Sequence, residues 1–354
     1  MVKWKGILLL FLPMLLLTGC WDKKDPEDRT FIISMGVDLS AEGCSFSFAP
    51  ADIEKGEAKM LEAESRTLAG AVAQIDTRTS RKTDLGQMKT IIFSRDVLAE
   101  KEKLDALLQE LERSQAVSEK VMLLATEGSA KDCVDAILAE DGKTGLFLWD
   151  FYKNTAREVA VTKGMDLDTF LTERWEQGGN AVFPRISAKE KKLEVGGGLA
   201  LAGEKIYVLD DQEERGYLFL LGEAEGALLE GKYKGETLPL EIGKSDVEYV
   251  FSLQDSNILC TVRLPLEGAL QGGGGTFLTP EEQRELEVVF SDIIKEEILH
   301  TIGIAKGANE DLFGILPRLY QQNPEWDLSR ESLWRGMVFE IQPELKLKDV
   351  GRKR

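Results

Sequence analysis

The sequence predicts an α+β fold of successive domains, each a mixed or antiparallel β-sheet with helices packed against it. In the first half, strand-like and helix-like patterns follow one another in the order β-β-α-β-α-β-α, which is typical of helices layered on a sheet. In the last third, two alternating stretches at 247–253 and 258–264 predict an antiparallel hairpin with one buried face. A chain of 354 residues is also longer than one compact core usually holds.

The first half contains short apolar runs and segments with helical spacing. The apolar runs predict strands at 30–38, 43–49, 87–94 and 119–126. Apolar residues at helical spacing predict a helix through Leu68 and Ile75 with Ser65 as its N-cap, and further helices at 96–113 and 130–138. A longer helical stretch is expected at 145–177, ended by Gly178 and Gly179.

The second half begins with short strands and ends with longer elements. The short strands are expected at 181–186, 199–202 and 205–209, and a short helix at 218–221. Thr279, Pro280 and Glu282 supply the N-cap, N1 proline and N3 acid of a long helix. A closing strand at 337–347 contains Pro343, which predicts an edge strand or a bulge.

These elements suggest a division of the chain. Residues 1–19 are expected to be a signal peptide, residues 20–185 an N-terminal α/β domain, and residues 186–354 a C-terminal α+β region. A division near residue 235 would split the C-terminal region into a small middle domain and a C-terminal domain.

The start of the chain predicts export and lipid attachment. Lys3 and Lys5 precede an apolar run at 6–17, and small residues follow it, as in a secretory signal peptide. Leu17-Thr18-Gly19-Cys20 resembles a bacterial lipobox, in which the thiol receives a diacylglyceryl group and becomes the new N-terminus. An ordinary signal peptide with a chance cysteine, or an uncleaved anchor, is the alternative. We expect a palmitate-type lipoprotein attached through Cys20 to the outer face of a membrane.

The charge argues against a nucleic-acid partner. The formal net charge is −18, and removal of residues 1–19 takes away Lys3 and Lys5 and no acidic residue. A surface this acidic repels nucleic acid and anionic headgroups. It favours a body that stays soluble beside the membrane.

The residues that usually carry catalysis are scarce. His300 is the only histidine, and its spacing from Ile293 predicts a packed side chain near a helix C-terminus rather than a base. Cys44, Cys133 and Cys260 are far apart and odd in number, so we expect buried free thiols and neither a disulfide framework nor a zinc site.

Acidic clusters and glycine runs complete the search for chemistry. Asp166 and Asp168 look like a helix N-terminus, and residues 210–214 look like an exposed acidic turn. The glycine runs at 196–198 and 272–275 lack phosphate-binding spacing and are expected to be loops. No enzymatic activity, metal or cofactor is predicted; a hydrolase with paired carboxylates is the weakest alternative.

Tryptophans could anchor an interface or fill the core. Trp149, Trp175, Trp326 and Trp334 are the candidates, and buried core positions are the more common fate of such residues.

Several motifs, in the same order along nearly the whole chain, resemble the Ger(x)C family, the lipoprotein C subunits of bacterial spore germinant receptors. The family starts its mature chain with Cys-Trp-Asp, and its later signatures include a strand ending in Gly-x-Asp. The matching residues are Cys20-Trp21-Asp22, Gly36-Val37-Asp38, Arg66-Thr67-Leu68, Lys89-Thr90-Ile91-Ile92-Phe93, Asp311-Leu312-Phe313-Gly314, Asn323-Pro324-Glu325-Trp326 and Trp334. Asp25-Pro26 and Ile315-Leu316-Pro317 depart from the family pattern.

This resemblance implies a non-enzymatic subunit on the outer face of the spore inner membrane, required for spore germination. It implies assembly with two integral-membrane subunits, of the A and B types, through protein–protein contacts. It also implies an α+β fold of successive domains. The alternative function, a solute-binding lipoprotein of a transport system, would have two doubly wound lobes around a deep cleft.

Overall fold

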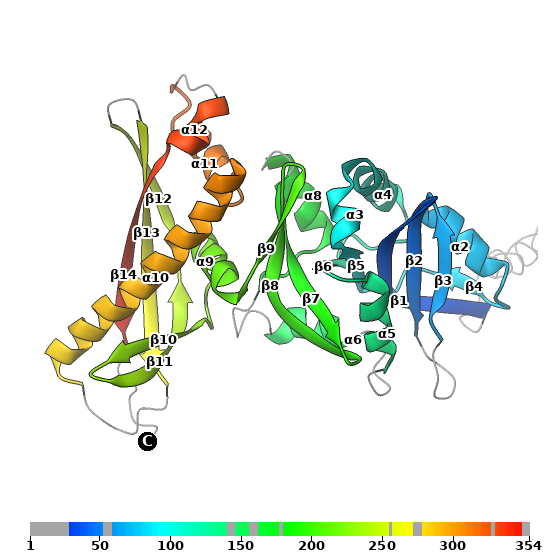
Figure 1. Ribbon diagram of the computed structural model, residues 1–354, viewed down its shortest axis with the longest axis horizontal. Coiled ribbons are helices and arrows are strands. Elements are labelled where there is room, and N and C mark those ends of the chain that lie inside the picture. The colour runs from blue at the N-terminus through cyan, green and yellow to red at the C-terminus, as the bar shows by residue number, and fades with distance from the viewer. Residues whose placement is uncertain are drawn as a thin grey trace, which may run out of the picture.

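The computed structural model describes residues 28–51, 59–139, 146–155, 162–176, 180–254, 257–271, 278–326 and 330–348. The predicted signal peptide, Cys20 and the glycine run at 272–275 lie outside these residues. Two β-sheets follow one another along the long axis of the molecule, and the helix α9 (Asp211–Leu221) lies between them (Figure 1). The predicted α+β class, with helices packed on each sheet, is confirmed.

The first sheet is mixed and has nine strands. Its order is β3-β2-β1-β5-β6-β7-β8-β9, and β4 pairs in parallel with the start of β1. The strands are β1 (Arg29–Ser40), β2 (Gly43–Pro50), β3 (Leu61–Ser65), β4 (Lys82–Asp84), β5 (Thr90–Ser94), β6 (Met122–Thr126), β7 (Ala181–Lys189), β8 (Lys192–Ala202) and β9 (Lys205–Leu209). The central pairs β1–β5 and β5–β6 are parallel, whereas the hairpins at both ends are antiparallel.

Helices cover both faces of the central strands. On one face, Ile91 and Phe93 of β5 pack with residues of α2 (Leu68–Asp76), α4 (Lys101–Arg113) and α8 (Leu167–Glu176). On the other face, Ile92 packs with α5 (Ala130–Ala139) and α6 (Leu146–Asp150). Successive residues of a strand point to opposite faces, so both kinds of position in β5 must be apolar. This explains why the strand reads as a continuous apolar run.

The Gly36-Val37-Asp38 segment of β1 holds the start of α5. The Asp38 carboxylate accepts hydrogen bonds from the backbone N–H groups of Ala130 (2.8 Å) and Lys131 (2.9 Å). It thereby caps amide groups that have no partner within the helix. A Cβ atom at Gly36 would lie 2.9 Å from the carbonyl oxygen of Ala130, so only glycine lets the helix approach this closely.

The start of α2 corrects one prediction. Ser65 ends strand β3, and the N-cap is Thr67, whose hydroxyl accepts the N–H of Gly70 (3.0 Å). The Glu110 carboxylate of α4 accepts the N–H groups of Leu68 and Ala69, both at 2.7 Å. The first turn of α2 is therefore capped from within its own segment and from a neighbouring helix.

Two predicted helices are interrupted. The helix expected at 96–113 is divided at Glu100 into α3 (Arg95–Ala99) and α4. The stretch expected at 145–177 contains α6, a π-helical turn (Phe151–Thr155) and α8, with irregular backbone at 162–165. Asp166 then caps α8 by accepting the N–H of Thr169 (2.8 Å), as predicted for a helix N-terminus.

The second sheet has five strands and one covered face. Its order is β10-β11-β13-β12, with β14 on the other edge of β13. The strands are β10 (Leu228–Tyr233), β11 (Glu236–Ser245), β12 (Glu248–Gln254), β13 (Asn257–Leu270) and β14 (Val338–Leu347). The predicted hairpin is β12–β13. The long helix α10 (Pro280–Ala308) crosses the sheet (Figure 1) and begins with the predicted capping box between Thr279 and Glu282.

Strand β14 confirms the prediction of an edge strand at Pro343. It pairs with β13 alone among the described strands, in parallel. Proline has no N–H to donate, so it is tolerated at an edge and also discourages a further strand from pairing there. Glu287 and Gln283 of α10 bond the backbone N–H and C=O of Leu347, which protects the end of the edge.

The motifs at 311–314 and at Trp334 complete the core of the second sheet. The Asp311 carboxylate accepts the N–H groups of Phe313 (3.0 Å) and Leu316 (2.6 Å) at the start of α11 (Ile315–Gln322). Trp334, in α12 (Arg330–Gly336), donates its indole N–H to the carbonyl of Ala305 (3.2 Å) and packs its ring beside Phe313. The predicted core position of Trp334 is confirmed.

Several further features were missed or misassigned from sequence, among them β4, α11 and α12. Strand β3 and the hairpin β10–β11 have too few apolar residues to stand out. Residues 196–198, expected to be a loop, lie inside β8. The first sheet continues to Leu209, and the division of the chain at 185/186 with a further division near 235 stays a prediction.

Replacement of Asp38 by alanine should destabilise the protein through loss of the cap on α5. We expect the free energy of unfolding to fall by about 1–2 kcal/mol, measured by urea denaturation. Asp38→Asn should be intermediate, because its single amide oxygen can replace only one of the two carboxylate oxygens that accept these N–H groups. Wild-type stability of Asp38→Ala would show that the cap contributes nothing.

Replacement of Trp334 by phenylalanine should loosen the contact between α10 and α12. It removes the donor to Ala305 and leaves a small void, so we expect a loss of about 2 kcal/mol in guanidinium denaturation followed by circular dichroism. Trp326→Phe is the control: Trp326 is only half-buried on the same core, and its loss should be about 1 kcal/mol or less. Equal losses in both variants would contradict a special role for Trp334.

Candidate functional site

The cysteines of the described residues are buried free thiols. Cys44, Cys133 and Cys260 form no disulfide, which confirms the prediction for these positions. Burial raises the pKa of the Cys133 thiol to about 11 and that of Cys260 to about 12, and it also raises the pKa of Cys44. A thiol with a raised pKa is a poor nucleophile and a poor metal ligand. These residues serve as small apolar side chains.

His300 is exposed, which corrects the prediction of a packed side chain. Its Nε2 atom lies 3.1 Å from the Glu213 carboxylate of α9, and 64% of the side chain is accessible to solvent. The prediction failed because Ile293 is itself only half-buried, and a step of seven residues drifts further around a helix. Two turns after Ile293, the side chain of His300 therefore faces water.

The two acidic clusters differ from each other. Asp166 and Asp168 flank the start of α8 and both bind the Lys120 ammonium, at 3.2 and 2.9 Å. The cluster at 210–214 was expected to be an exposed turn, but it forms the first turn of α9, and Glu214 is buried. Glu214 precedes the buried residues Tyr217 and Leu218 by three and four positions, so the helix turns it onto the same face. This spacing in the sequence could have predicted that Glu214 lies on the buried face of the helix.

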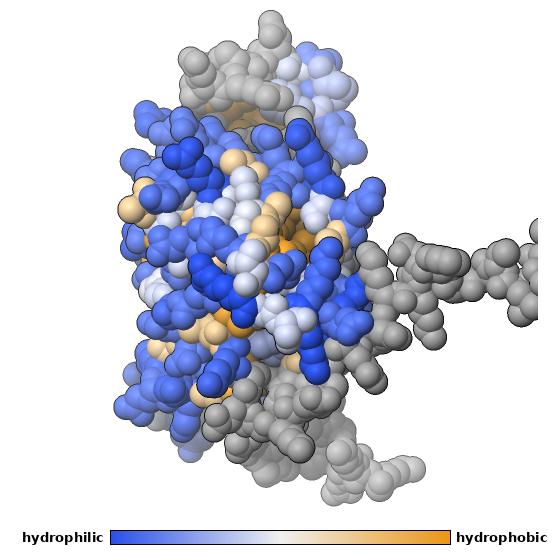
Figure 2. Space-filling model, turned by 90° about the vertical axis from the view of Figure 1, so that its right-hand side faces the viewer, coloured by the Kyte–Doolittle hydropathy of each residue, from blue (hydrophilic) through white to orange (hydrophobic). Residues whose placement is uncertain are grey.

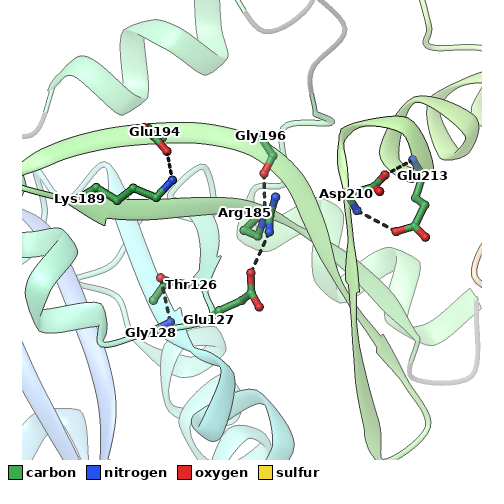
Figure 3. Close-up of polar contacts among 9 residues, drawn as sticks. All are labelled: Thr126, Glu127, Gly128, Arg185, Lys189, Glu194, Gly196, Asp210 and Glu213. Atoms are coloured by element: carbon green, nitrogen blue, oxygen red, sulfur yellow. Dashed lines mark hydrogen bonds and ion pairs between the residues drawn. The ribbon is translucent and has the colours of Figure 1, made fainter.

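A capping box marks the point where the first sheet passes into α9. The Asp210 carboxylate accepts the N–H groups of Gln212 and Glu213, both at 2.9 Å, and the Glu213 carboxylate accepts the N–H of Asp210 at 2.8 Å. Figure 3 shows these reciprocal bonds at the end of β9. The turn from strand to helix is therefore fixed by side chains of the helix itself.

Glu214 places a carboxyl group between the two sheets. Its Oε1 atom accepts the hydroxyl of Thr162 (3.2 Å) and the N–H of Lys163 (3.4 Å), while its Oε2 has no hydrogen-bond partner among the described residues. Burial raises the pKa of this carboxyl to about 7; the hydrogen bonds from Lys163 and Thr162 and the charges of Arg185 and Lys163 oppose that shift. Glu214 therefore changes its protonation near neutral pH.

The glycine run in β8 makes room for this carboxyl group. A Cβ atom at Gly198 would overlap Oε2 of Glu214, and one at Gly197 would overlap the carbonyl oxygen of Leu209. Gly197 also has a positive φ of 68°, a conformation that other residues rarely adopt. The run thus permits a close approach between strand, helix and carboxylate.

Arg185 of β7 lies beside the glycine run, bonded to Gly196 and Glu127 (Figure 3). Its Nε donates to the carbonyl of Gly196 and its Nη1 to the Glu127 carboxylate, both at 2.8 Å. Glu127 follows β6, so Arg185 connects three strands at the end of the first sheet. The guanidinium is held between two acceptors.

A second polar cluster joins the sheets beside Asn180. The Asn180 amide donates to the Glu310 carboxylate (3.0 Å) and to the carbonyl of Asp311 (3.2 Å), and its oxygen accepts the N–H of Gly203 (2.9 Å). Gly203 is in the β8–β9 turn, and Glu310 and Asp311 follow α10. The cluster therefore connects the first sheet to the segment that follows α10, the helix that covers the second sheet.

Helix α9 is bound to α10 by an ion pair and a side-chain hydrogen bond. Arg215 forms a bidentate ion pair with the buried Glu297, and Thr301 donates to the backbone carbonyl of Glu213 (3.0 Å). Gly216 allows this contact, since a Cβ atom there would overlap the Thr301 hydroxyl. Helices α9 and α10 consequently form one structural unit.

The junction brings together groups that hold the two sheets against each other. Within the described part of the chain, no set of three His, Cys, Asp or Glu side chains is placed to hold a metal ion. None of the described helices is both long and apolar enough to cross a membrane. The arrangement can hold and release a proton at the contact between the two sheets.

Surface tryptophans and apolar residues are dispersed. Trp149 and Trp326 are half-buried, whereas the side chain of Trp175 lies outside the described residues. Figure 2 views the molecule from the end formed by β3, β4 and α2, and that face is largely hydrophilic with scattered hydrophobic residues. Hydrophobicity alone does not mark an interface on this end.

Two protein families match consecutive parts of the chain. The family described as the spore germination protein N-terminal domain matches residues 22–188, and the family described as spore germination B3/GerAC-like, C-terminal, matches residues 197–351. Together they include both sheets. The first match ends inside β7, and the second begins in the glycine run of β8.

Individual relatives and a solved structure agree with these matches. Spore germination protein KC of Bacillus subtilis (strain 168) is 19% identical over 98% of this chain and 94% of its own length. Spore germination protein A3 of the same organism is 21% identical over 75% of this chain and 73% of its own. GerQC of Bacillus cereus is 23% identical over 56% of this chain and 54% of its own.

The crystal structure of the GerBC protein has the same fold. It superposes with a TM-score of 0.60 at 12% identity and covers 88% of this chain and 96% of its own. The family matches, with both sheets inside them, account for nearly all of the described residues. The chain therefore belongs to the GerAC-like family of spore germination proteins, the Ger(x)C family.

Proposed function

We propose that this protein is the lipid-anchored, extracytoplasmic C subunit of a spore germinant receptor, required for germination through assembly with integral-membrane subunits of the A and B types. The observation that carries the proposal is the match of two spore germination families to consecutive parts of one chain. Relatives named as spore germination proteins cover up to 98% of it. The spore inner membrane is the proposed location.

The proposed anchor is Cys20. It completes the lipobox Leu17-Thr18-Gly19-Cys20, and two acyl chains on its glyceryl group would bind a membrane firmly because each buried CH₂ contributes about 0.8 kcal/mol. Residues 21–28 can span at most about 30 Å when fully extended. The beginning of β1, paired with β4, would then lie close to the membrane surface.

A role by contact rather than by catalysis is supported by the chemistry of the body. The three described thiols are buried, and His300 is paired with Glu213 on the surface. Anchoring raises the effective concentration of such a body beside membrane-embedded partners, so modest contacts suffice for assembly. The alternative, a solute-binding lipoprotein, gains no support from the fold, because the second sheet has one helix-covered face and mostly antiparallel pairing.

Replacement of Cys20 by alanine tests the anchor. The variant should leave the membrane fraction of spores, because the acyl chains have no other attachment point, and the rate of germination should fall at least about tenfold as the effective concentration is lost. Fractionation with immunoblotting and a germination assay measure both effects.

Cys44→Ala is the matched control for the anchor. Cys44 is buried in the first sheet, so its replacement should leave membrane attachment intact. A Cys20→Ala protein that remains fully membrane-bound and active would disprove the lipid anchor.

Purification of the tagged wild-type protein from spore membranes in mild detergent tests the partners. Two integral-membrane proteins, one multi-spanning and permease-like, should co-purify in constant proportion, and the Cys20→Ala variant should recover much less of both. Recovery of the chain alone would count against the assembly. A large rise in melting temperature of the isolated protein with amino acids or sugars would favour the solute-binding alternative.

A further inference from the structure

Glu214 is part of α9, which packs on the second sheet through α10, but its carboxyl group contacts the first sheet. Its helix packs on α10 and closes the core of the second sheet with Tyr217 and Leu218. Its carboxyl group lies instead against Gly198 of β8 and bonds Thr162 and Lys163, which precede α8. The contact therefore crosses the boundary between the two sheets.

The two described cations that face Glu214, Arg185 and Lys163, are engaged by other carboxylates. Arg185 of β7 pairs with Glu127, and Lys163 pairs with Glu173 of α8 at 2.6 Å and more loosely with Glu223 at 3.7 Å. Both cations lower the pKa of Glu214 only as secondary influences, after burial has raised it. An ionised Glu214 would thus be a buried charge with incomplete compensation.

Among the described residues, the other titratable groups around Glu214 are acidic or phenolic. Tyr152 of the π-helical turn and Tyr217 of α9 are buried, and both have a raised pKa through burial and through the nearby Glu214 charge. The hydroxyl of Tyr152 and Oε2 of Glu173 have no hydrogen-bond partner among the described residues. These acidic and phenolic groups provide no positive charge to compensate an ionised Glu214 carboxylate.

Contacts on the α10 side of α9 do not depend on Glu214. Arg215 pairs with Glu297, and Glu213 pairs with His300. These residues adjoin Glu214 in sequence but bind α9 to α10. When the contact with β8 weakens, α9 should remain with the second sheet, so the opening would occur between the two sheets.

We propose that Glu214 is a proton-operated latch between the two sheets, which holds α9 against β8 and residues 162–163 when protonated and releases that contact when ionised. The sign of the pH dependence follows from burial. Because the pKa is about 7 in the closed state and near its ordinary value of 4.5 once water reaches the carboxyl, the closed state loses stability as pH rises from about 4.5 to about 7. Above about 7, both states are ionised and the effect is constant. The inference does not rest on the proposed role in germination.

Hydrogen exchange of the full chain in detergent micelles, read by mass spectrometry, tests the latch. Wild type and Glu214→Gln are compared at each pH between 5.5 and 8, so that the intrinsic pH dependence of exchange cancels. Exchange at residues 162–165, 196–202 and 211–221 should accelerate with pH in wild type relative to Glu214→Gln, by at least about tenfold across the range. The N-terminal half of α10 should show no such difference.

Two further variants make the test decisive. Glu194→Gln removes an exposed carboxylate of β8, paired with Lys189, and should behave as wild type. Thr162→Val removes one hydroxyl donor to the carboxylate at nearly constant volume, and should move the midpoint of the transition to higher pH. Thr162→Val also tests the latch if the Glu214→Gln protein fails to fold.

Two outcomes would overturn the latch. The same pH dependence in wild type and Glu214→Gln would show that another group titrates. Equal acceleration in all segments, including the N-terminal half of α10, would show that the proton affects global stability and not the contact between the sheets.

Discussion

The relative position of the two sheets depends on α9, which has one face in each half of the molecule. Apolar residues such as Tyr217 and Phe219 complete the core beneath the second sheet, and the carboxyl group of Glu214 lies against β8 of the first. Burial of a carboxyl group is costly unless it is hydrogen-bonded or protonated. Both compensations are present here: Thr162 and Lys163 donate hydrogen bonds, and the raised pKa keeps the proton available near neutral pH.

The glycine run of β8 follows from the same constraint. A strand that must pass between Leu209 and Glu214 has no space for side chains at 197 and 198. The sequence pattern suggested a flexible loop, because consecutive glycines usually mark one. In the structure these glycines allow close packing. The register between β7 and β8 shifts beside them, between Pro184 and Ile186, and the pairing of β8 with β9 begins at Gly198.

The residues that carry the family resemblance have structural roles. Asp38, Thr67 and Asp311 each accept backbone N–H groups at the start of a helix, and Trp334 closes the core behind Phe313. Such positions satisfy buried polar groups that have no other partner, which limits the side chains that fit.

Much of the fold could be predicted because local patterns were strong. The capping box at Thr279, the alternation in β12 and β13 and the apolar runs of β5 and β6 each predicted its element. Strand β3 and the hairpin β10–β11 were missed, since edge strands with many polar residues carry little periodic signal. The burial of His300 and of the cluster at 210–214 was predicted wrongly for a different reason: their exposure depends on which face of a helix meets the core.

The amino-acid sequence by itself determined the class of fold, predicted a lipobox at Cys20 and supplied one histidine and widely spaced cysteines, because these depend on residue identity and local spacing. Only the tertiary structure decided that Glu214 is buried while Glu213 reaches His300 on the surface. Adjacent glutamates have the same chemistry in an extended chain. Their environments diverge only when α9 packs between two sheets, and long-range packing is not encoded in any short window of sequence.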